Sequence, residues 1–231
     1  MNINELIRQK RIHGLKQEVT EQEKMMLKQG VPVQKIIGFI NFDNLQINVN
    51  HNVLIPRYET EEVLHACLPF INKNSRVLDL CCGSGYLGLS IKHKTNADVV
   101  LSDMDDEAIL QTQENAQLNN LHVQVIKSDL FDNIQGKFDL IVSNPPYIPD
   151  DHVLDESVVK HEPKIALFGG KDGNDFYKKI IAQAPNFLTP QGVLVLEISP
   201  DNVHYLASQG FEIKQDINQK DRIAIKRMPW S

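Results

Sequence analysis

Cysteine is scarce in this sequence, and its spacing excludes the usual zinc sites. Cys67, Cys81 and Cys82 are the three cysteines among 231 residues, and no Cys-x-x-Cys pair occurs. Structural zinc sites combine several cysteine and histidine ligands at short spacing, so we predict no metal centre. Adjacent cysteines rarely bridge each other, which favours free thiols in a reducing compartment.

Long apolar runs and a surplus of basic residues are missing as well. No apolar run approaches the roughly 20 residues of a membrane span, and the N-terminal segment MNINELIRQKR lacks the apolar core of a signal peptide. We therefore expect a cytoplasmic protein without a membrane partner. The 24 Lys and Arg residues against 30 Asp and Glu residues give a net charge of −6. This balance argues against direct nucleic-acid binding and favours a protein or a small molecule as the partner of a monomer.

The composition that remains is typical of a globular protein. Hydrophobic residues make up 42% and charged residues 23% of the chain. The length suffices for one α/β domain with a small appendage. We predict that residues 1–52 form this appendage, a short helical segment and a β-hairpin, and that residues 53–231 form the main domain.

Local signals define the elements of the N-terminal region. Thr20 and Glu23 have the spacing of a capping box, and residues 1–30 are predicted to be helical. Apolar and polar residues alternate within 35–50, which predicts the hairpin. A further helix is expected from about residue 60 to 70.

From residue 75 onward, short apolar runs alternate with amphipathic stretches. Strands are predicted at 76–80, 98–102, 122–126, 138–143, 193–198, 210–215 and 222–226. Helices are predicted near 85–93, 105–119, 173–187 and 201–208. This alternation indicates a mostly parallel seven-stranded sheet with helices on both faces. Ligands of such sheets bind beyond the carboxyl ends of the strands, so the residues after each strand are the candidates for a site.

A glycine-rich loop follows the first of these strands. Gly83, Gly85 and Gly88 match the pattern Gly-x-Gly-x-x-Gly between a strand and a helix. Glycine lets the backbone turn sharply and approach a ligand closely, and the next helix offers free N–H groups. A plain tight turn explains the pattern equally well when it stands alone. The candidate cofactor-binding residues here are Asp79, Cys81, Cys82, Gly83, Ser84 and Gly85.

Two acidic positions after later strands extend this candidate site. Asp103, with Met104 beside it, lies 18 residues beyond Gly85 and can accept hydrogen bonds from two ribose hydroxyls. Asp129 can accept from an adenine amino group, with Leu130 or Phe131 covering the ring. The alternatives are a helix N-terminal acid at Asp103, and a loop acid beside core residues at Asp129. Together with the glycine loop, these positions predict a nucleoside-containing cofactor.

The segment after the strand at 138–143 carries the strongest chemical signal. It reads Asn144-Pro145-Pro146-Tyr147, and its two prolines remove two backbone donors and make the loop rigid. The Asn144 side-chain oxygen and the Pro145 carbonyl can accept both hydrogens of a planar NH2 group, on which Tyr147 can stack. A Pro-Pro turn alone explains the prolines but not the flanking Asn and Tyr. We predict that the catalytic residues are Asn144, Pro145, Pro146 and Tyr147, with Asn144 also facing the cofactor.

Together with the glycine loop and Asp103, this segment resembles the amino-directed class of S-adenosylmethionine methyltransferases. Two further segments are similar to HemK-like glutamine methyltransferases: Ile55-Pro56-Arg57-Tyr58-Glu59-Thr60-Glu61, and the stretch from Glu162-Pro163 to Asp172-Gly173. The resemblance implies a Rossmann-like class I methyltransferase fold with S-adenosylmethionine as cofactor and S-adenosylhomocysteine as product. It also implies methylation of a glutamine N5 in a protein, at the Gly-Gly-Gln tip of a peptide chain release factor.

Several features depart from this family pattern or leave other functions open. Tyr58 replaces the usual proline, and the family's longer N-terminal helical domain is reduced here, which leaves open how the release factor docks. Roles for Arg57, Glu59 and Glu162 are also open. The alternatives are methylation of a ribosomal-protein glutamine and methylation of adenine or cytosine amino groups in nucleic acid. An NAD- or FAD-dependent dehydrogenase would also use the glycine loop and Asp103.

Overall fold

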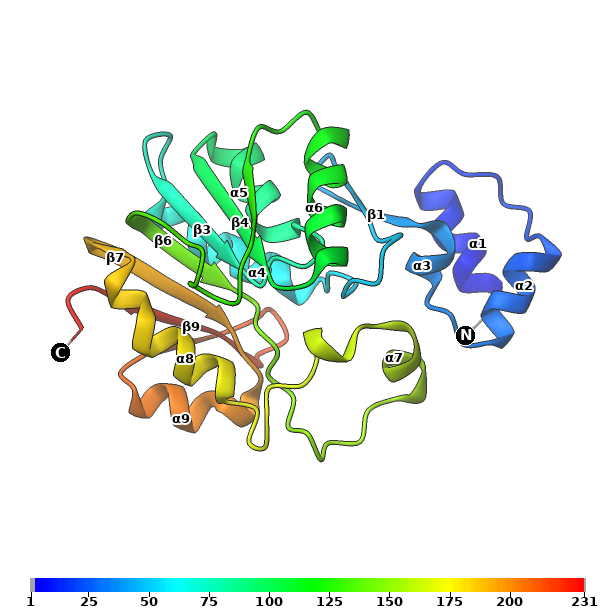
Figure 1. Cartoon of the computed structure of the whole chain (residues 1–231). Coiled ribbons are helices and arrows are strands. Elements are labelled where there is room, and N and C mark those ends of the chain that lie inside the picture. Colours follow the sequence, from blue (N-terminus) through cyan, green and yellow to red (C-terminus); the bar gives the residue numbers. More distant parts are fainter. Residues whose placement is uncertain (1–2, 231) are drawn as a thin grey trace.

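The computed structural model describes residues 3–230, and its main body is a seven-stranded sheet (Figure 1). The strands are β3 (Arg76–Leu80), β4 (Asp98–Asp103), β5 (Gln124–Lys127), β6 (Phe138–Ser143), β7 (Leu188–Glu197), β8 (Glu212–Gln215) and β9 (Asp221–Arg227). Their order is β5-β4-β3-β6-β7-β9-β8. The strands from β5 to β7 in this order are parallel, and β9 is antiparallel to both neighbours. The predicted mostly parallel α/β sheet is confirmed.

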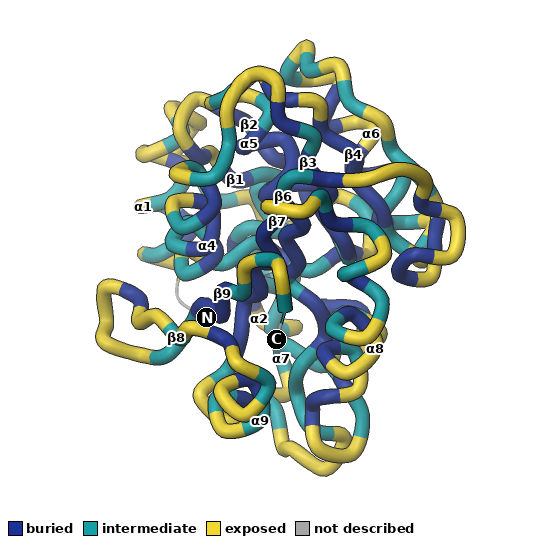
Figure 2. Tube along the Cα trace, turned by 90° about the vertical axis from the view of Figure 1, so that its left-hand side faces the viewer, coloured by how far each residue is buried: buried dark blue, intermediate teal, exposed yellow. Residues whose placement is uncertain are grey.

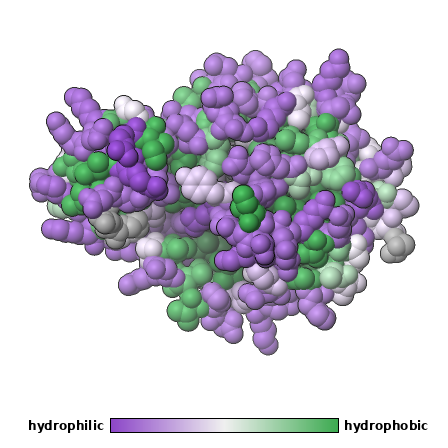
Figure 3. All heavy atoms as spheres, turned by 180° about the vertical axis from the view of Figure 1, so that it is seen from behind, coloured by the Kyte–Doolittle hydropathy of each residue, from purple (hydrophilic) through white to green (hydrophobic). Residues whose placement is uncertain are grey.

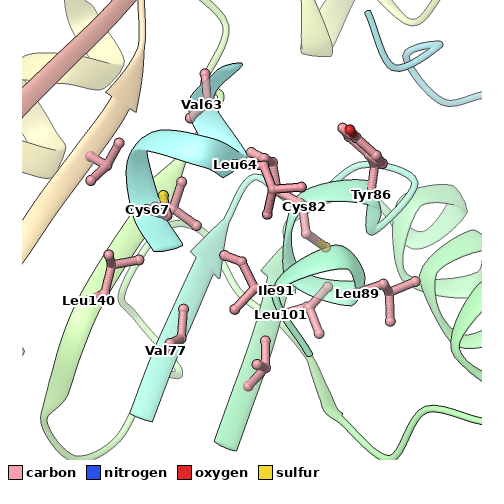
Figure 4. Packing of buried hydrophobic residues seen from close by; sticks show 14 of the residues in the cluster. Val63, Leu64, Cys67, Val77, Cys82, Tyr86, Leu89, Ile91, Leu101 and Leu140 are labelled. Atoms are coloured by element: carbon pink, nitrogen blue, oxygen red, sulfur yellow. The ribbon is translucent and has the colours of Figure 1, made fainter. Parts of the chain in front are cut away.

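Helices cover both faces of this sheet. They are α4 (Glu59–Cys67), α5 (Tyr86–Thr95), α6 (Asp106–Leu118), α8 (Asp175–Gln183) and α9 (Val203–Ser208). Val77 of β3 packs into one apolar cluster with α4 and α5, whereas Leu78 packs into another with α8 and α9. Successive side chains of a strand point to opposite faces, so a strand covered on both sides is apolar almost throughout. Figure 4 shows the first cluster, and Figure 2 shows the buried strands at the centre of the molecule.

The N-terminal region lies beside the sheet (Figure 1, blue). It contains α1 (Ile3–Ile12), α2 (Glu21–Lys28), α3 (Val33–Ile37) and the hairpin of β1 (Phe39–Phe42) and β2 (Leu45–Asn48). The capping box predicted at Thr20 and Glu23 is confirmed at the start of α2.

Two predictions for this region need correction. Of the helix predicted over residues 1–30, residues 1–2 lie outside the described range, and residues 13–20 separate α1 from α2. The hairpin predicted from residue 35 begins at Phe39, because α3 precedes it. Gly38, the residue directly after α3, has a φ of 91°. Gly38 thus ends the helix in a left-handed conformation that glycine adopts without strain.

One short helix was not predicted from the sequence. α7 (Glu156–His161) is capped by the Asp155 side chain, which accepts a hydrogen bond of 2.8 Å from the Ser157 N–H. The His161 ring lies 3.2 Å from the Gln29 carbonyl at the end of α2. α7 therefore contacts the N-terminal region, as Figure 1 also shows.

The polarity of the surface agrees with the charged fraction of the sequence, which is 23%. The face in Figure 3 is mainly hydrophilic, with scattered apolar side chains. Within residues 3–230, no helix combines the length and the apolar character needed to cross a membrane.

Amide side chains on one face of α6 bind the main chain of the hairpin. Asn119, directly after α6, accepts from the Gln46 N–H at 3.1 Å and donates to the Gln46 carbonyl at 2.8 Å. Asn115 makes the same pair of bonds to Asn48, at 2.9 and 3.0 Å. Residues four apart share a helix face, so these amides replace a neighbouring strand along the free edge of β2. Asn115 also donates to the Ser84 carbonyl at 2.9 Å, which joins the hairpin to the glycine loop.

Replacement of Asn115 by Ala is expected to destabilise the protein. The substitution leaves the Asn48 N–H and two carbonyl groups without their partner at a position that is 0% exposed. We expect the free energy of unfolding in urea to fall by about 2–3 kcal/mol. Gln117→Ala, at an exposed position of the same helix, is the matched control. Equal effects of the two substitutions would contradict the role of the amide pairs.

Candidate active site

A hollow opens where β3, β4 and β6 end, and its empty space, open solvent included, is about 920 Å³. This is the edge at which parallel sheets bind their ligands. Eleven predicted site residues line it: Asp79, Cys81, Cys82, Gly83, Ser84, Asp103, Met104, Asp129, Leu130, Asn144 and Pro146. Gly85, Pro145 and Tyr147 are not among the lining residues.

Part of the wall was not predicted. Asn52, Val53, Leu54 and Pro56 form one side, and Phe176 at the start of α8 contributes to the lining. The segment similar to Ile-Pro-Arg in the glutamine methyltransferases contained a signal for Pro56, and also for Thr60. No pattern in the sequence pointed to Phe176.

The Asp103 carboxylate accepts hydrogen bonds from the backbone of the glycine loop and of its own turn. Asp103 Oδ2 accepts the Gly83 N–H at 2.9 Å, and Asp103 Oδ1 accepts the Asp105 N–H at 3.0 Å. A carboxylate has about four acceptor positions, so Asp103 keeps acceptor capacity for a ligand. Cys81 has a φ of 58°, a left-handed conformation that is uncommon outside glycine. Such backbone strain concentrates at binding sites.

Asp79 binds the first turn of α5, the helix that follows this loop. The residue is 1% exposed, and its Oδ2 accepts the Gly88 N–H at 2.8 Å. A Cβ at Gly88 would lie 2.6 Å from Leu101 Cδ2, so only glycine allows α5 to pack this closely on the sheet. Burial, followed by the nearby Asp103 charge, raises the pKa of Asp79 to about 7, although the Gly88 bond opposes the shift.

The two adjacent cysteines line the hollow as unreactive thiols. Both are free, and Cys82 Sγ lies 3.5 Å from Thr112 Oγ1. Burial, with the Asp103 charge as a further cause, raises the pKa of both thiols above the ordinary range. Thiolates are the nucleophilic form of cysteine, so these side chains supply surface rather than covalent chemistry.

The turn after β5 places Leu130 and Phe131, the two alternatives for covering the adenine ring, in different surroundings. Leu130 is buried and lines the hollow with a φ of 46°, while Ser128 Oγ donates to its carbonyl at 2.8 Å. Phe131 instead stacks on Phe187 in the core, with ring centroids 4.6 Å apart. Asp129 is exposed at the rim, and its carboxylate has no hydrogen bond to any residue in the described range.

The loop after β6 presents unpaired acceptors. Ser143 Oγ donates to the Leu80 carbonyl at 2.8 Å and fixes the start of the loop. Asn144 is half-buried in the wall of the hollow, and its side-chain amide has no partner within residues 3–230. The Pro145 carbonyl likewise accepts no hydrogen bond from that part of the chain. Both oxygens are therefore available to accept hydrogen bonds from a ligand.

Two glycines confine the backbone of the same loop. A Cβ at Gly169 would overlap the Pro146 carbonyl oxygen, and a Cβ at Gly173 would overlap the Tyr147 carbonyl oxygen. The Gly169 N–H donates to the Ile148 carbonyl at 2.8 Å. The segment from residue 169 to 173 therefore works as a close-fitting support for the loop, which explains its glycines.

An ion pair connects two further parts of the wall. Arg57 Nη2 lies 2.6 Å from Glu162 Oε1, and the Glu162 side chain is 1% exposed. Pro56, directly before Arg57, and Pro163, directly after Glu162, both line the hollow. The ion pair therefore joins two parts of the wall that lie far apart in the sequence.

The pKa of Asp79 gives a test of this packing. Because the folded protein holds a proton at Asp79 up to about pH 7 and an unfolded Asp has a pKa of about 3.9, this group stabilises the fold most below about pH 4 and loses that contribution as the pH rises. Asp79→Asn keeps an oxygen for the Gly88 N–H but does not titrate. We expect its free energy of unfolding, relative to the wild type, to rise by a few kcal/mol between about pH 4 and 7.

Urea unfolding at a series of pH values measures this difference. The exposed Asp132, replaced by Asn, is the control. A difference between Asp79→Asn and the wild type that stays constant across the pH series would contradict the assigned burial effect.

Known proteins resemble this chain over most of its length. Residues 59–162 match the family model of the methyltransferase small domain. The chain is 37% identical to the release factor glutamine methyltransferase of Lactococcus lactis subsp. lactis, covering 96% of this chain and 89% of that protein. It is 38% identical to the one of Clostridium botulinum, covering 85% and 75%. A solved methyltransferase structure from Pyrococcus furiosus matches with a TM-score of 0.63 at 18% identity, covering 90% and 98%, which shows the fold.

These likenesses decide between the families that the sequence left open. Both curated relatives are matched over three quarters or more of their own length, so the agreement does not depend on one motif. A dehydrogenase is excluded, because the glycine loop that suggested it belongs to a methyltransferase domain. The chain belongs to the family of S-adenosylmethionine-dependent release factor glutamine methyltransferases.

Proposed function

We propose that this protein methylates the side-chain amide nitrogen of a glutamine in a peptide chain release factor, at its Gly-Gly-Gln tip. The observation that carries the proposal is the unpaired amide of Asn144 in the wall of the hollow. The names of the similar proteins support the acceptor. Arg57 and Glu162 act in this proposal as wall supports.

The groups that line the hollow suit the chemistry of S-adenosylmethionine. Asp103 keeps acceptor capacity for the ribose hydroxyls, and the Asp129 carboxylate, unpaired within residues 3–230, can accept from the adenine amino group. Leu130 and Phe176 provide apolar surface for the ring. When bound, the cofactor supplies an electrophilic methyl group on its positively charged sulfur.

The acceptor nitrogen needs help, because its lone pair is delocalised into the amide carbonyl. Asn144 Oδ1 and the Pro145 carbonyl can accept its two N–H groups, which favours positive charge on nitrogen and directs the lone pair toward the methyl carbon. Orientation of this kind supplies several kcal/mol of the rate enhancement, and fixed dipoles add to it. A nitrogen–carbon bond forms as the sulfur–carbon bond breaks, S-adenosylhomocysteine leaves, and the nitrogen then loses a proton to water. Stacking of Tyr147 on the amide remains part of the proposal.

Three further statements belong to the same proposal. The protein acts as a monomer in the cytoplasm, where its release factor substrate is found. It binds protein rather than nucleic acid, in keeping with its net charge of −6. Residues 1–52 form a short N-terminal helical segment and β-hairpin, and residues 53–231 form the S-adenosylmethionine-dependent methyltransferase domain.

Transfer of labelled methyl groups tests the reaction and its acceptor together. The purified protein receives labelled S-adenosylmethionine with a release factor, with the same factor carrying Ala for the Gly-Gly-Gln glutamine, with ribosomal proteins, or with duplex DNA. We expect label on the unmodified factor alone. Label on ribosomal protein or DNA would replace the proposed substrate.

Asn144→Ala is expected to lower kcat by about 100-fold or more, because the acceptor amide loses one of its two fixed acceptors. The dissociation constant of S-adenosylhomocysteine, measured by calorimetry, should change much less. Parallel loss of binding and turnover would contradict the role assigned to Asn144.

Gly173→Ala tests the support of the acceptor loop. The φ of Gly173 is 69°, and a Cβ there overlaps the Tyr147 carbonyl oxygen, so we expect kcat to fall about tenfold or more while cofactor affinity is retained. Gly210→Ala is the matched control, since Gly210 has a φ of 79° but its Cβ would meet no atom closer than 3.7 Å. Similar kcat losses in both variants would assign the effect to backbone strain instead of to the loop.

A further inference from the structure

We propose that His51 is a positioning residue of the cofactor site, whose ring ties one wall of the hollow to α6 and completes this tie only as the imidazolium cation. The inference rests on the placement of the cofactor in the hollow, as proposed above, and concerns affinity for the cofactor rather than the choice of the acceptor. His51 does not line the hollow, so it acts through its neighbours and not on the bound molecule.

The polar face of α6 that holds the hairpin continues toward the hollow. Asn119 and Asn115 bind the main chain of β2, as described above. One turn earlier, the Gln111 side-chain oxygen accepts the His51 N–H at 2.9 Å. A further turn earlier, Glu107 Oε2 lies 3.0 Å from the His51 ring. Residues at this spacing share one face of a helix, so α6 holds the chain from β2 up to the residue before the wall.

Both nitrogens of the His51 ring face carboxylates of α6. Nδ1 lies 3.0 Å from Glu107 Oε2, and Nε2 lies 3.1 Å from Glu114 Oε1. An ionised carboxylate only accepts hydrogen bonds, and a neutral imidazole has a single N–H. The imidazolium alone can therefore donate at both contacts at once. When the ring is neutral, one of the two carboxylate oxygens faces a nitrogen lone pair.

The ring stands where two parts of the wall meet. Asn52 and Val53, directly after His51, line the hollow, and so does Ala108 in the first turn of α6. Val53 and Ala108 also belong to one small apolar cluster. The two ring contacts span 56 and 63 residues of chain. Protonation of His51 therefore strengthens the connection between wall segments that are distant in the sequence.

Charged groups from two elements lie against His51. Glu107 and Glu114 of α6 face its ring, and Lys35 of α3 donates from Nζ to its carbonyl at 2.6 Å. The Glu114 hydrogen bond is the main cause that raises the pKa of His51, burial opposes it, and the Glu107 bond adds to it. With a raised pKa, the full tie is present below the ordinary value of about 6.5 and is lost as the pH rises through the folded-state pKa.

The size of the effect follows from the exposure of the partners. The side chains of Glu107 and Glu114 are 47% and 52% exposed, and ion pairs at such positions are weak. We therefore expect the tie to change cofactor affinity about two- to fivefold. An ion pair without a role in binding would stabilise the free and the bound protein equally, and its loss would leave the affinity unchanged.

His51→Gln tests the tie through the dissociation constant of S-adenosylhomocysteine, measured by calorimetry at a series of pH values. At about pH 6, below the ordinary pKa of histidine, the variant should bind about two- to fivefold more weakly than the wild type. The ratio of the two dissociation constants should shrink as the pH rises. Asp79 and Asp103 also titrate, but both proteins contain them, so the ratio isolates His51. His122→Gln, at an exposed position after α6, is the control and should follow the wild type.

Glu114→Gln should have the opposite effect at high pH. A glutamine amide can accept from the imidazolium through its oxygen and donate to the neutral ring through its nitrogen. The variant should therefore match the wild type at about pH 6 and bind about two- to fivefold more tightly at higher pH, where the wild-type tie is incomplete. Damage to the fold would not produce tighter binding.

The titration of His51, followed by NMR and assigned with His51→Gln, gives a readout independent of both variants' affinities. Coupling between two binding events is reciprocal. If the imidazolium favours the cofactor, saturating S-adenosylhomocysteine must move the midpoint of the His51 titration to higher pH. An unmoved midpoint, or a His51→Gln ratio that is constant with pH, would overturn the inference. If His51→Gln fails to fold, Glu114→Gln with equal affinity to the wild type at every pH overturns it.

Asp103→Asn separates this inference from the proposals on which it rests. Unaltered affinity of Asp103→Asn for S-adenosylhomocysteine would overturn the placement of the cofactor and this inference with it. Weaker binding by Asp103→Asn without the pH-dependent effects at His51 would overturn the inference alone. Protein that shows those effects but methylates no release factor would overturn the proposed acceptor and support the role of His51.

Discussion

The parallel pairing of β3 with β4 on one side and β6 on the other is the constraint on which the site depends. It brings the glycine loop, Asp103 and Asn144 to one edge of the sheet, although they are spread over about sixty residues of chain. Each group then needs only local support. Gly83 and Asp105 orient the Asp103 carboxylate, and glycines hold the acceptor loop. The sheet therefore sets the distance between cofactor and acceptor residues, and the loops set their orientation.

The site concentrates features that destabilise an ordinary interior. Cys81 and Leu130 have left-handed backbones, and Asp79 and Glu197 are buried acids with raised pKa values. Each feature alone costs free energy, and the extensively packed sheet around them offsets that cost. Their common location at one edge indicates that the hollow was shaped by its ligand rather than by stability.

Elements with a strong apolar period could be predicted from the sequence, and those held by tertiary contacts could not. The bounds of β3 and β6 agree with the predicted ones, because buried strands are apolar almost throughout. α7 has only six residues and depends on a cap and on contacts with the N-terminal region. In the site, residues directly after strands followed from the position rule. The wall at Asn52 and Phe176 depends on how distant segments fold back, which no local pattern records.

The hairpin is attached to α6 by side chains whose partners lie far along the chain. The bonds between Gln46 and Asn119 span 73 residues, and those between Asn48 and Asn115 span 67. During synthesis the hairpin therefore leaves the ribosome long before its binding face exists. The hairpin can reach its final place only after residue 119 has been made, because Asn119 binds its Gln46 backbone. The order of translation thus leaves the hairpin unfastened until about half of the 231 residues have been made.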